Sequence, residues 1–113
     1  MQLMTAALRR ALPPLYSQEH VDDPVVVAKW FDPCGSWTWY ATEASAQLPN
    51  GDLVPLADAP PDADVLCFGW VDGTEPELGY FSLAELAGVK GRFGLGIERD
   101  LYWRPRPLSQ VRR

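Results

Sequence analysis

The side chains that most often carry out nucleophilic and acid–base chemistry occur in this chain without a catalytic arrangement. Nucleophilic catalysis needs a nucleophile beside a base, yet the sequence has no Gly-x-Ser-x-Gly motif, and its one histidine, His20, lies in a polar segment. His20 could bind a divalent cation weakly together with its neighbours Glu19, Asp22 and Asp23. One histidine beside adjacent acids, however, fixes no coordination geometry. We therefore interpret the segment as a solvated loop and predict no catalytic residue, no metal site and no cofactor.

Two further patterns resemble sites of known chemistry. Segment 91–96 has glycine at its first, fourth and sixth positions, as a phosphate-binding loop would. It does not lead from a strand into a helix of a βαβ unit, and no Gly-Lys-Ser/Thr is present, so we interpret these glycines as loop residues. Glu43, Glu77 and Glu98 lie near predicted strands and could pair for acid–base work. A chain with 15 acids produces such pairs by chance.

The two cysteines lack the spacing of a metal or redox site. Cys34 lies in a Pro-Cys-Gly turn and Cys67 lies inside a predicted strand, with no Cys-x-x-Cys anywhere in the chain. One histidine cannot complete a zinc site of common spacing. We interpret both cysteines as reduced structural thiols, and a disulfide remains open if the fold brings them together.

Charge is distributed unevenly along the chain, whose net charge is −5. Residues 30–89 contain ten acids and no Lys, Arg or His, whereas residues 90–113 contain seven cations against two acids. Phosphate backbones need clustered cations, so the acidic middle disfavours direct nucleic-acid binding there. The Arg-rich end could contact an anionic partner, or it could be a solvated terminus.

Aromatic side chains are the most distinctive feature of the sequence, which has five tryptophans. In the alternating run 37–43, Trp37, Trp39 and Ala41 share one face, and Thr38, Tyr40 and Thr42 share the other. One face must be core, and exposed aromatic residues on the other would mark a binding site. Three interpretations stay open: core packing alone, a protein-binding face, and single-strand nucleic-acid binding. The last needs nearby cations, which this sheet lacks.

The elements that would position these residues follow from periodicity and capping. A helix is predicted at 6–12, capped by Thr5 and stopped by Pro13-Pro14. A second is predicted at 83–87 after the capping box Ser82-x-x-Glu85. Strands are predicted at 25–31, 37–43, 65–71 and 78–81, the first two as a hairpin. Segment 97–103 favours a strand, and the Arg/Pro-rich residues after it favour an extended chain.

These elements predict an α+β fold. Short connections favour antiparallel pairing, so we expect a twisted antiparallel four- or five-stranded sheet with two short helices packed on it. The length fits a single domain, 1–113. Residues 44–64, rich in Pro, Ala and Asp, are expected to form a variable and mobile excursion within it. A short hairpin there would place Leu48 opposite Leu53 and Val54.

The compartment is predicted from what the chain lacks. No stretch reaches the roughly 20 apolar residues that span a bilayer. Residues 1–15 carry Arg9 and Arg10 with no apolar run after them, unlike a signal peptide. We therefore expect a cytoplasmic protein.

Four blocks of sequence together carry a family resemblance: Leu8 to Tyr16, Trp37 to Glu43, Glu77 to Leu83, and Ile97 to Trp103 with Pro105-x-Pro107-Leu108 after it. On these blocks, which cover most of the chain outside 44–64, the sequence resembles domain-of-unknown-function family 2958. The resemblance implies a small bacterial protein often carried by plasmids, phages and integrative elements, with an accessory role in the biology of mobile elements. It implies no activity and no functional residues.

Taken together, these features favour a non-enzymatic accessory protein of a mobile genetic element that acts by binding another protein. The candidate binding residues are Trp37, Trp39, Tyr40, Glu43, Glu77, Tyr80, Glu98, Arg99 and Asp100. One alternative is a nucleic-acid-binding module that uses the Arg-rich C-terminal segment. Another is an acidic DNA mimic that inhibits host defence, and a third is a small enzyme or ligand binder with a cleft near these carboxylates and tyrosines. The oligomeric state stays open.

Overall fold

Most strands of the fold belong to one antiparallel sheet in the computed structural model, which describes residues 2–91 and 94–112. The helices are α1 (Ala6–Ala11) and α2 (Leu83–Gly88), with 3₁₀ turns η1 (Leu56–Asp58) and η3 (Leu108–Gln110). The strands are β1 (Val25–Val26), β2 (Ala28–Phe31), β3 (Thr38–Gln47), β4 (Leu53–Val54), β5 (Asp64–Asp72), β6 (Glu77–Ser82), β7 (Glu98–Arg99) and β8 (Arg106–Pro107).

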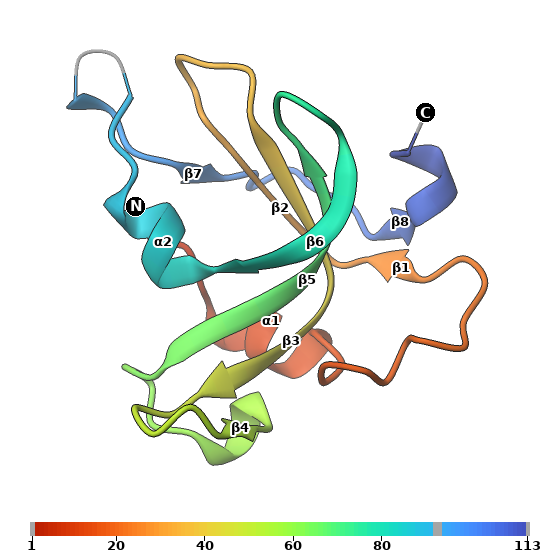
Figure 1. Cartoon of the computed structure of the whole chain (residues 1–113), viewed down its shortest axis with the longest axis vertical. Coiled ribbons are helices and arrows are strands. Elements are labelled where there is room, and N and C mark those ends of the chain that lie inside the picture. The colour runs from red at the N-terminus through yellow and green to blue at the C-terminus, as the bar shows by residue number, and fades with distance from the viewer. Residues whose placement is uncertain (1, 92–93, 113) are drawn as a thin grey trace.

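The sheet has the order β6-β5-β3-β2-β7, with β4 paired to the far end of β3, and β1 and β8 form a separate pair. The predicted α+β fold, a twisted antiparallel sheet with two short helices, is confirmed (Figure 1). The sheet has six strands rather than four or five. Strand β4 lies where a short hairpin within 44–64 was expected, and β7 keeps only two residues of the strand expected at 97–103.

The predicted hairpin of β2 and β3 is also confirmed, with Trp30 opposite Trp39. The strand predicted at 25–31 is interrupted at Val27, because β1 pairs with β8 whereas β2 pairs with β3. Strand β3 runs on to Gln47, four residues beyond the predicted end, and pairs with β5 over its whole length.

A β-bulge in β3 changes which side chains face which way. The pairing with β5 shifts between Ala41 and Glu43, so Thr42 is the extra residue. Thr42 therefore does not continue the Tyr40 face as predicted; its hydroxyl donates to the Phe68 carbonyl at 3.1 Å. Opposite the bulge, a Cβ on Gly69 would collide with the main-chain carbonyl of Tyr40.

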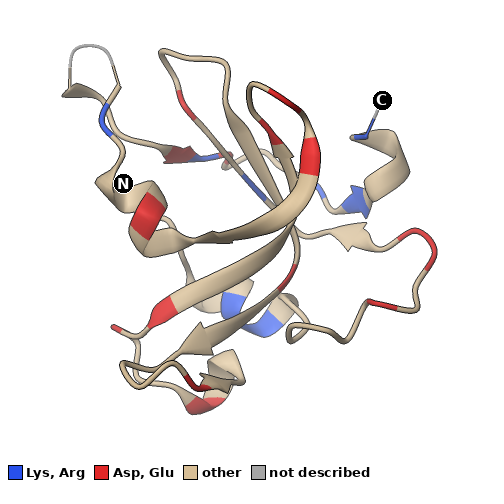
Figure 2. Ribbon diagram, viewed as in Figure 1, with Lys and Arg blue, Asp and Glu red and all other residues tan. Residues whose placement is uncertain are grey.

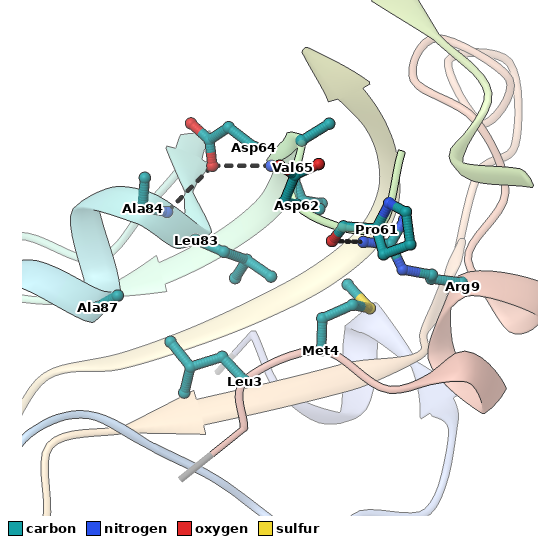
Figure 3. A pocket seen from close by; sticks show the side chains of 11 residues that line it. Leu3, Met4, Arg9, Pro61, Asp62, Asp64, Val65, Leu83, Ala84 and Ala87 are labelled. Atoms are coloured by element: carbon teal, nitrogen blue, oxygen red, sulfur yellow. Dashed lines mark hydrogen bonds between the residues drawn. The ribbon is translucent and has the colours of Figure 1, made fainter. Parts of the chain in front are cut away.

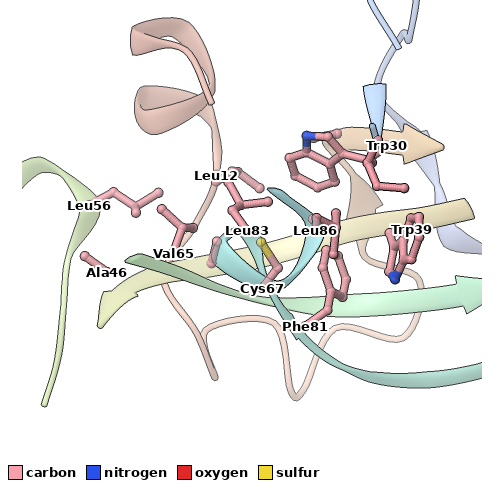
Figure 4. Packing of buried hydrophobic residues seen from close by; sticks show 14 residues of the cluster. Leu12, Trp30, Trp39, Ala46, Leu56, Val65, Cys67, Phe81, Leu83 and Leu86 are labelled. Atoms are coloured by element: carbon pink, nitrogen blue, oxygen red, sulfur yellow. The ribbon is translucent and has the colours of Figure 1, made fainter. Parts of the chain in front are cut away.

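Both helices begin at the predicted caps. The Thr5 hydroxyl accepts from the Leu8 amide at 3.1 Å, and the Ser82 hydroxyl accepts from the Glu85 amide at 3.0 Å. Each short helix then contributes to one side of the sheet, where the main core lies. Trp30 is completely buried there; its ring meets Phe81 edge-on, and its indole N–H donates to the Leu3 carbonyl at 2.9 Å (Figure 4).

Part of the segment 44–64, expected as an excursion, belongs to the sheet. Within 44–64, Ala44 to Gln47 belong to β3, and Ala44 and Ala46 are buried in the core. The predicted short hairpin exists, but Leu53 pairs with Gln47 and Val54 with Ala46, so Leu48 lies in the turn instead.

The chain after β7 is less extended than the sequence indicated. Only Glu98 and Arg99 form a strand, because the Asp100 carboxylate accepts from the Tyr102 amide at 2.9 Å and turns the chain. The predicted extended C-terminal segment is wrong beyond Pro107, where η3 buries Leu108 against the second side of the sheet.

Candidate binding surface

The side of the sheet opposite the main core carries two rows of aromatic residues. Residues directly opposite each other on neighbouring strands share a face. One row runs Lys29, Tyr40, Trp70, Leu78 across β2, β3, β5 and β6. The adjacent row runs Glu43, Phe68, Tyr80. The two rows differ in exposure, because the C-terminal segment lies over only the first.

The covered half of this face is built by a small apolar cluster. Val26, Trp70 and Leu108 are buried together, with Tyr40 and Trp103 packed against them. The Tyr40 and Trp103 ring centroids are 5.6 Å apart, and the Trp103 indole N–H donates to the Val26 carbonyl at 3.0 Å. Trp70 is only 8% exposed as a result. These rings therefore pack within the domain and are not available to a partner.

Cations of the chain lie on the rings of the covered half. The Arg106 guanidinium lies 4.3 Å from the Trp103 ring centroid, and that of Arg112 lies 5.0 Å from the Trp70 centroid. The Lys29 ammonium lies 5.7 Å from both the Tyr40 and Trp103 centroids. The expectation that the sheet lacks nearby cations is therefore wrong for this half, because the fold returns the Arg-rich segment to it.

The other half of the face is open. We call Tyr16, Phe68, Leu78 and Tyr80 the open aromatic patch. Tyr16 is 51% exposed and Tyr80 is 52% exposed, while Phe68 lies 4.8 Å from Tyr80 between ring centroids. Leu78 is also exposed at the margin with the covered half. Large rings this exposed and this close together form the kind of apolar surface that binds partners.

Tyr16 reaches this patch because a buried carboxylate holds its backbone. Glu43 is only 3% exposed, and its two oxygens accept from the Tyr16 amide at 2.9 Å and the Gln18 amide at 3.0 Å. Tyr16 has φ of 72°, a left-handed conformation that costs a residue with a side chain free energy. Two further contacts fix the same loop: the Leu15 amide donates to the Ser45 hydroxyl, and the Ala44 amide donates to the Pro13 carbonyl.

The surroundings of Tyr80 are acidic. Partial burial, a hydrogen bond with the Tyr16 side chain and the nearby Glu43 and Glu19 carboxylates raise the pKa of Tyr80 above its ordinary value. On the covered half, burial and then Asp72 raise the pKa of Tyr40. Figure 2 shows acids in the loop between β5 and β6 and in the loop before β1, with cations on α1 and β8. Arg92 and Arg113 lie outside the described residues.

The nine residues proposed from sequence do not form one site. Trp39 is buried in the core, with the half-exposed Trp37 ring 5.9 Å from it. Glu77 begins β6 at one edge of the sheet, whereas Glu98 and Arg99 form β7 at the opposite edge. The other four divide between the halves: Tyr40 and Asp100 on the covered half, Glu43 and Tyr80 on the open half. The Asp100 carboxylate pairs with the Lys29 ammonium at 3.6 Å.

The surface also has a groove of about 350 Å³ between the N-terminal segment and α2 (Figure 3). Leu3, Met4 and Leu83 contribute apolar walls. Two polar groups that line it are already engaged. The Arg9 guanidinium donates to the Pro61 carbonyl at 2.9 Å, and the Asp64 carboxylate accepts from the Ala84 amide at 3.0 Å. Asp62 also lines the groove.

Within the described part of the chain, no group of three or more His, Cys, Asp or Glu side chains could hold a metal ion. Both cysteines are free thiols. Complete burial raises the pKa of Cys67 far above its ordinary value, so this thiol is unsuited to act as a nucleophile. His20 is exposed in its loop.

Sequence reasoning missed Tyr16, Phe68 and Leu78 as members of one surface. Phe68 and Leu78 lay in predicted strands, and the short turn between those strands was a usable signal for their register. Tyr16 lacked any signal, because its place depends on a bulge and a carboxylate 27 residues away. The same holds for Trp103, whose indole bonds to a residue 77 positions earlier.

Comparison with known proteins gives a family without an assigned activity. The family model described as "Protein of unknown function (DUF2958)" matches residues 3–111. No curated protein and no solved structure matches the chain. In the described residues, no helix is long and apolar enough to cross a membrane.

Proposed function

Because the chain belongs to this family of unknown function, DUF2958, we propose its role from geometry: the domain is non-enzymatic and binds another protein through the open aromatic patch. On this proposal it is an accessory protein, and the family resemblance of the sequence suggests a mobile genetic element as its setting. The main support for the proposal is that the C-terminal segment covers only half of the second sheet face, which leaves Tyr16 and Tyr80 half exposed.

The chemistry of the patch favours a protein partner over a small substrate. Protein-binding hot spots are enriched in tyrosine, which offers a large apolar ring with a hydroxyl at its end. The patch lies on strands β5 and β6 and on a loop that Glu43 fixes, so it needs little ordering when it binds.

Photo-crosslinking tests this function directly. One variant carries p-benzoylphenylalanine in place of Tyr80, and a matched control carries it in place of Tyr102, which is exposed but lies outside the patch. We expect a discrete protein adduct in the host cell from position 80 only, lost when Tyr16→Ala is added. Equal adducts from both positions, or none from position 80, would contradict the proposal.

A second candidate function is nucleic-acid binding by the Arg-rich C-terminal segment. The observation in its favour is the group of Arg106, Arg112 and Lys29 over aromatic rings. Its weakness is that Trp70 is covered, so a base could stack there only if the segment moved away. A mobility-shift assay at about 50 mM salt with single- and double-stranded DNA tests it. A shift that Arg106→Ala weakens supports this function, and no shift removes it.

The proposal that the protein mimics DNA makes a narrower claim about the partner. Acids spread over residues 30–89 would imitate phosphates, and the bound protein would be a host nuclease or another DNA-binding defence protein. Competition decides this: DNA should displace the protein from the crosslinked partner. A partner with no affinity for DNA would end the DNA-mimic proposal and leave protein binding intact.

A further inference from the structure

Strand β6 forms an edge of the sheet and contains no lysine, no proline and no bulge. Within the described residues its only strand neighbour is β5. Natural edge strands are guarded by lysine, proline or bulges. Strand β6 has the sequence Glu-Leu-Gly-Tyr-Phe-Ser and pairs with β5 in continuous register from Glu77 to Ser82. Alternate residues along it therefore direct N–H and C=O groups outward, where a further strand could pair with them.

The open aromatic patch adjoins this edge, since Leu78 and Tyr80 are residues of β6. A strand added beside β6 would place alternate side chains on the same face as Tyr80. Those side chains would lie against the Tyr80 ring and the neighbouring Tyr16 ring. Above Gly79, on the opposite face, no atom lies within 4 Å of where a Cβ would be, so that face of β6 is also uncovered at Gly79.

Charge around this edge favours a basic segment. Residues 72–85, which contain β6 and the loop before it, carry Asp72, Glu75, Glu77 and Glu85 and no Lys, Arg or His. Glu19, from the loop before β1, also lies near Tyr80. An added strand with positive side chains would gain from this field, while an acidic strand would be repelled. A second copy of this chain, pairing β6 with β6, would bring like charges together.

The covered half of the same face supplies a template for such binding. There the chain places its own Arg106 and Arg112 over Trp103 and Trp70. Among the described residues, no cation lies over Tyr16, Phe68 or Tyr80. The open half therefore has the aromatic rings of such an arrangement but, in the described residues, no cation over them.

We propose that the free edge of β6 and the open aromatic patch together bind an extended segment of another protein that carries arginine or lysine at alternate positions. The segment adds to the sheet as an antiparallel or parallel strand, and its cations lie over Tyr80 and Tyr16. This inference rests on the proposed function and specifies the chemistry of its partner.

The test uses the ¹⁵N-labelled full chain and synthetic octapeptides followed by NMR. The probe is an alternating Arg-Val peptide. Its controls are the matching Glu-Val peptide and an Arg-Val peptide with N-methylated backbone amides. We expect the Arg-Val peptide to shift the amide signals of 77–82 at concentrations up to about 1 mM. Methylation and the Tyr80→Ala variant should each weaken binding about tenfold, whereas Tyr102→Ala should leave it unchanged.

The other outcomes separate this inference from the proposed function. Equal binding of the Glu-Val peptide overturns the basic partner. Binding that ignores methylation, or that shifts the patch without 77–82, overturns strand addition. Self-association through β6, detected by sedimentation of the unliganded chain, also overturns it. No binding of any peptide overturns the inference, and the crosslinking at position 80 then decides separately whether the patch binds a protein at all.

Discussion

The Glu43 carboxylate should stabilise the fold and the patch together, and Glu43→Gln tests this. In the native chain both carboxylate oxygens accept backbone amides in an almost completely buried position. Glutamine keeps the shape but replaces one acceptor oxygen with an NH₂ group, which then faces a donor. One charge-assisted hydrogen bond is lost and one buried amide of the Tyr16 loop is left without its acceptor.

The size of the effect follows from those two contacts. A hydrogen bond to a charged group contributes about 1.5–3 kcal/mol, and a buried donor without a partner costs about 1–3 kcal/mol. Removal of the buried charge offsets part of this. We expect the free energy of unfolding to fall by about 2–3 kcal/mol and Tm to fall by roughly 8–12 °C. Urea unfolding followed by tryptophan fluorescence at neutral pH measures it.

A matched control and a local readout sharpen this prediction. Glu77→Gln removes the same charge at an exposed position, where we expect a change of no more than about 0.5 kcal/mol. Hydrogen exchange at the Tyr16 and Gln18 amides should accelerate in Glu43→Gln only. If the two variants unfold alike, or if both amides stay protected, the Glu43 carboxylate does not hold the loop that places Tyr16 in the patch.

Three further predictions concern backbone packing, a thiol and a surface carboxylate. Gly69→Ala should lower the free energy of unfolding by about 1–3 kcal/mol, because the added methyl group would collide with the Tyr40 carbonyl on the neighbouring strand. Gly79→Ala is the control: its methyl group enters open space, so the free energy of unfolding should change by less than about 1 kcal/mol. Urea unfolding measures both. The buried Cys67 thiol should resist Ellman's reagent in the native chain and react once urea unfolds it; fast native reaction would refute its burial. Hydrogen bonds from the Ser109 hydroxyl and amide lower the pKa of Asp23 from 3.8, so its stabilising effect should be complete above that pH and be lost as pH falls through the lowered value. The free energies of unfolding of the native chain and of Asp23→Asn should therefore differ at about pH 7 and draw together as pH falls below 3.8. A difference that stays constant with pH would contradict this.

Features with a local cause could be predicted from the sequence. The hairpin of β2 and β3 follows from alternating residues around a turn, and both helix starts follow from Thr5 and Ser82, whose hydroxyls cap amides three residues later. The two-residue strands β4 and β7 lie where a short hairpin and a strand at 97–103 were expected, but their bounds could not be predicted, since each strand exists only where a longer strand is there to pair with.

The candidate surface depended more on long-range contacts. Alternation correctly separated the Trp39 and Tyr40 faces but could not reveal that the Trp39 face is the core. No turn residue in the sequence indicates the bulge at Thr42. The bulge directs the Glu43 side chain toward the Tyr16 loop. Which rings stay exposed then depends on where Leu108 packs, a contact between segments at opposite ends of the sequence.

The pairing of β1 with β8 also governs how the domain is made. Ser109 bonds to Asp23 across 86 residues, and β8 closes over the covered half only after both have been synthesised. Until the later segment has folded back, Tyr40 and Trp70 are uncovered and resemble the patch that the folded protein keeps open. A folding chain therefore exposes a wider apolar surface than the finished domain, and it is most prone to aggregation before β8 docks.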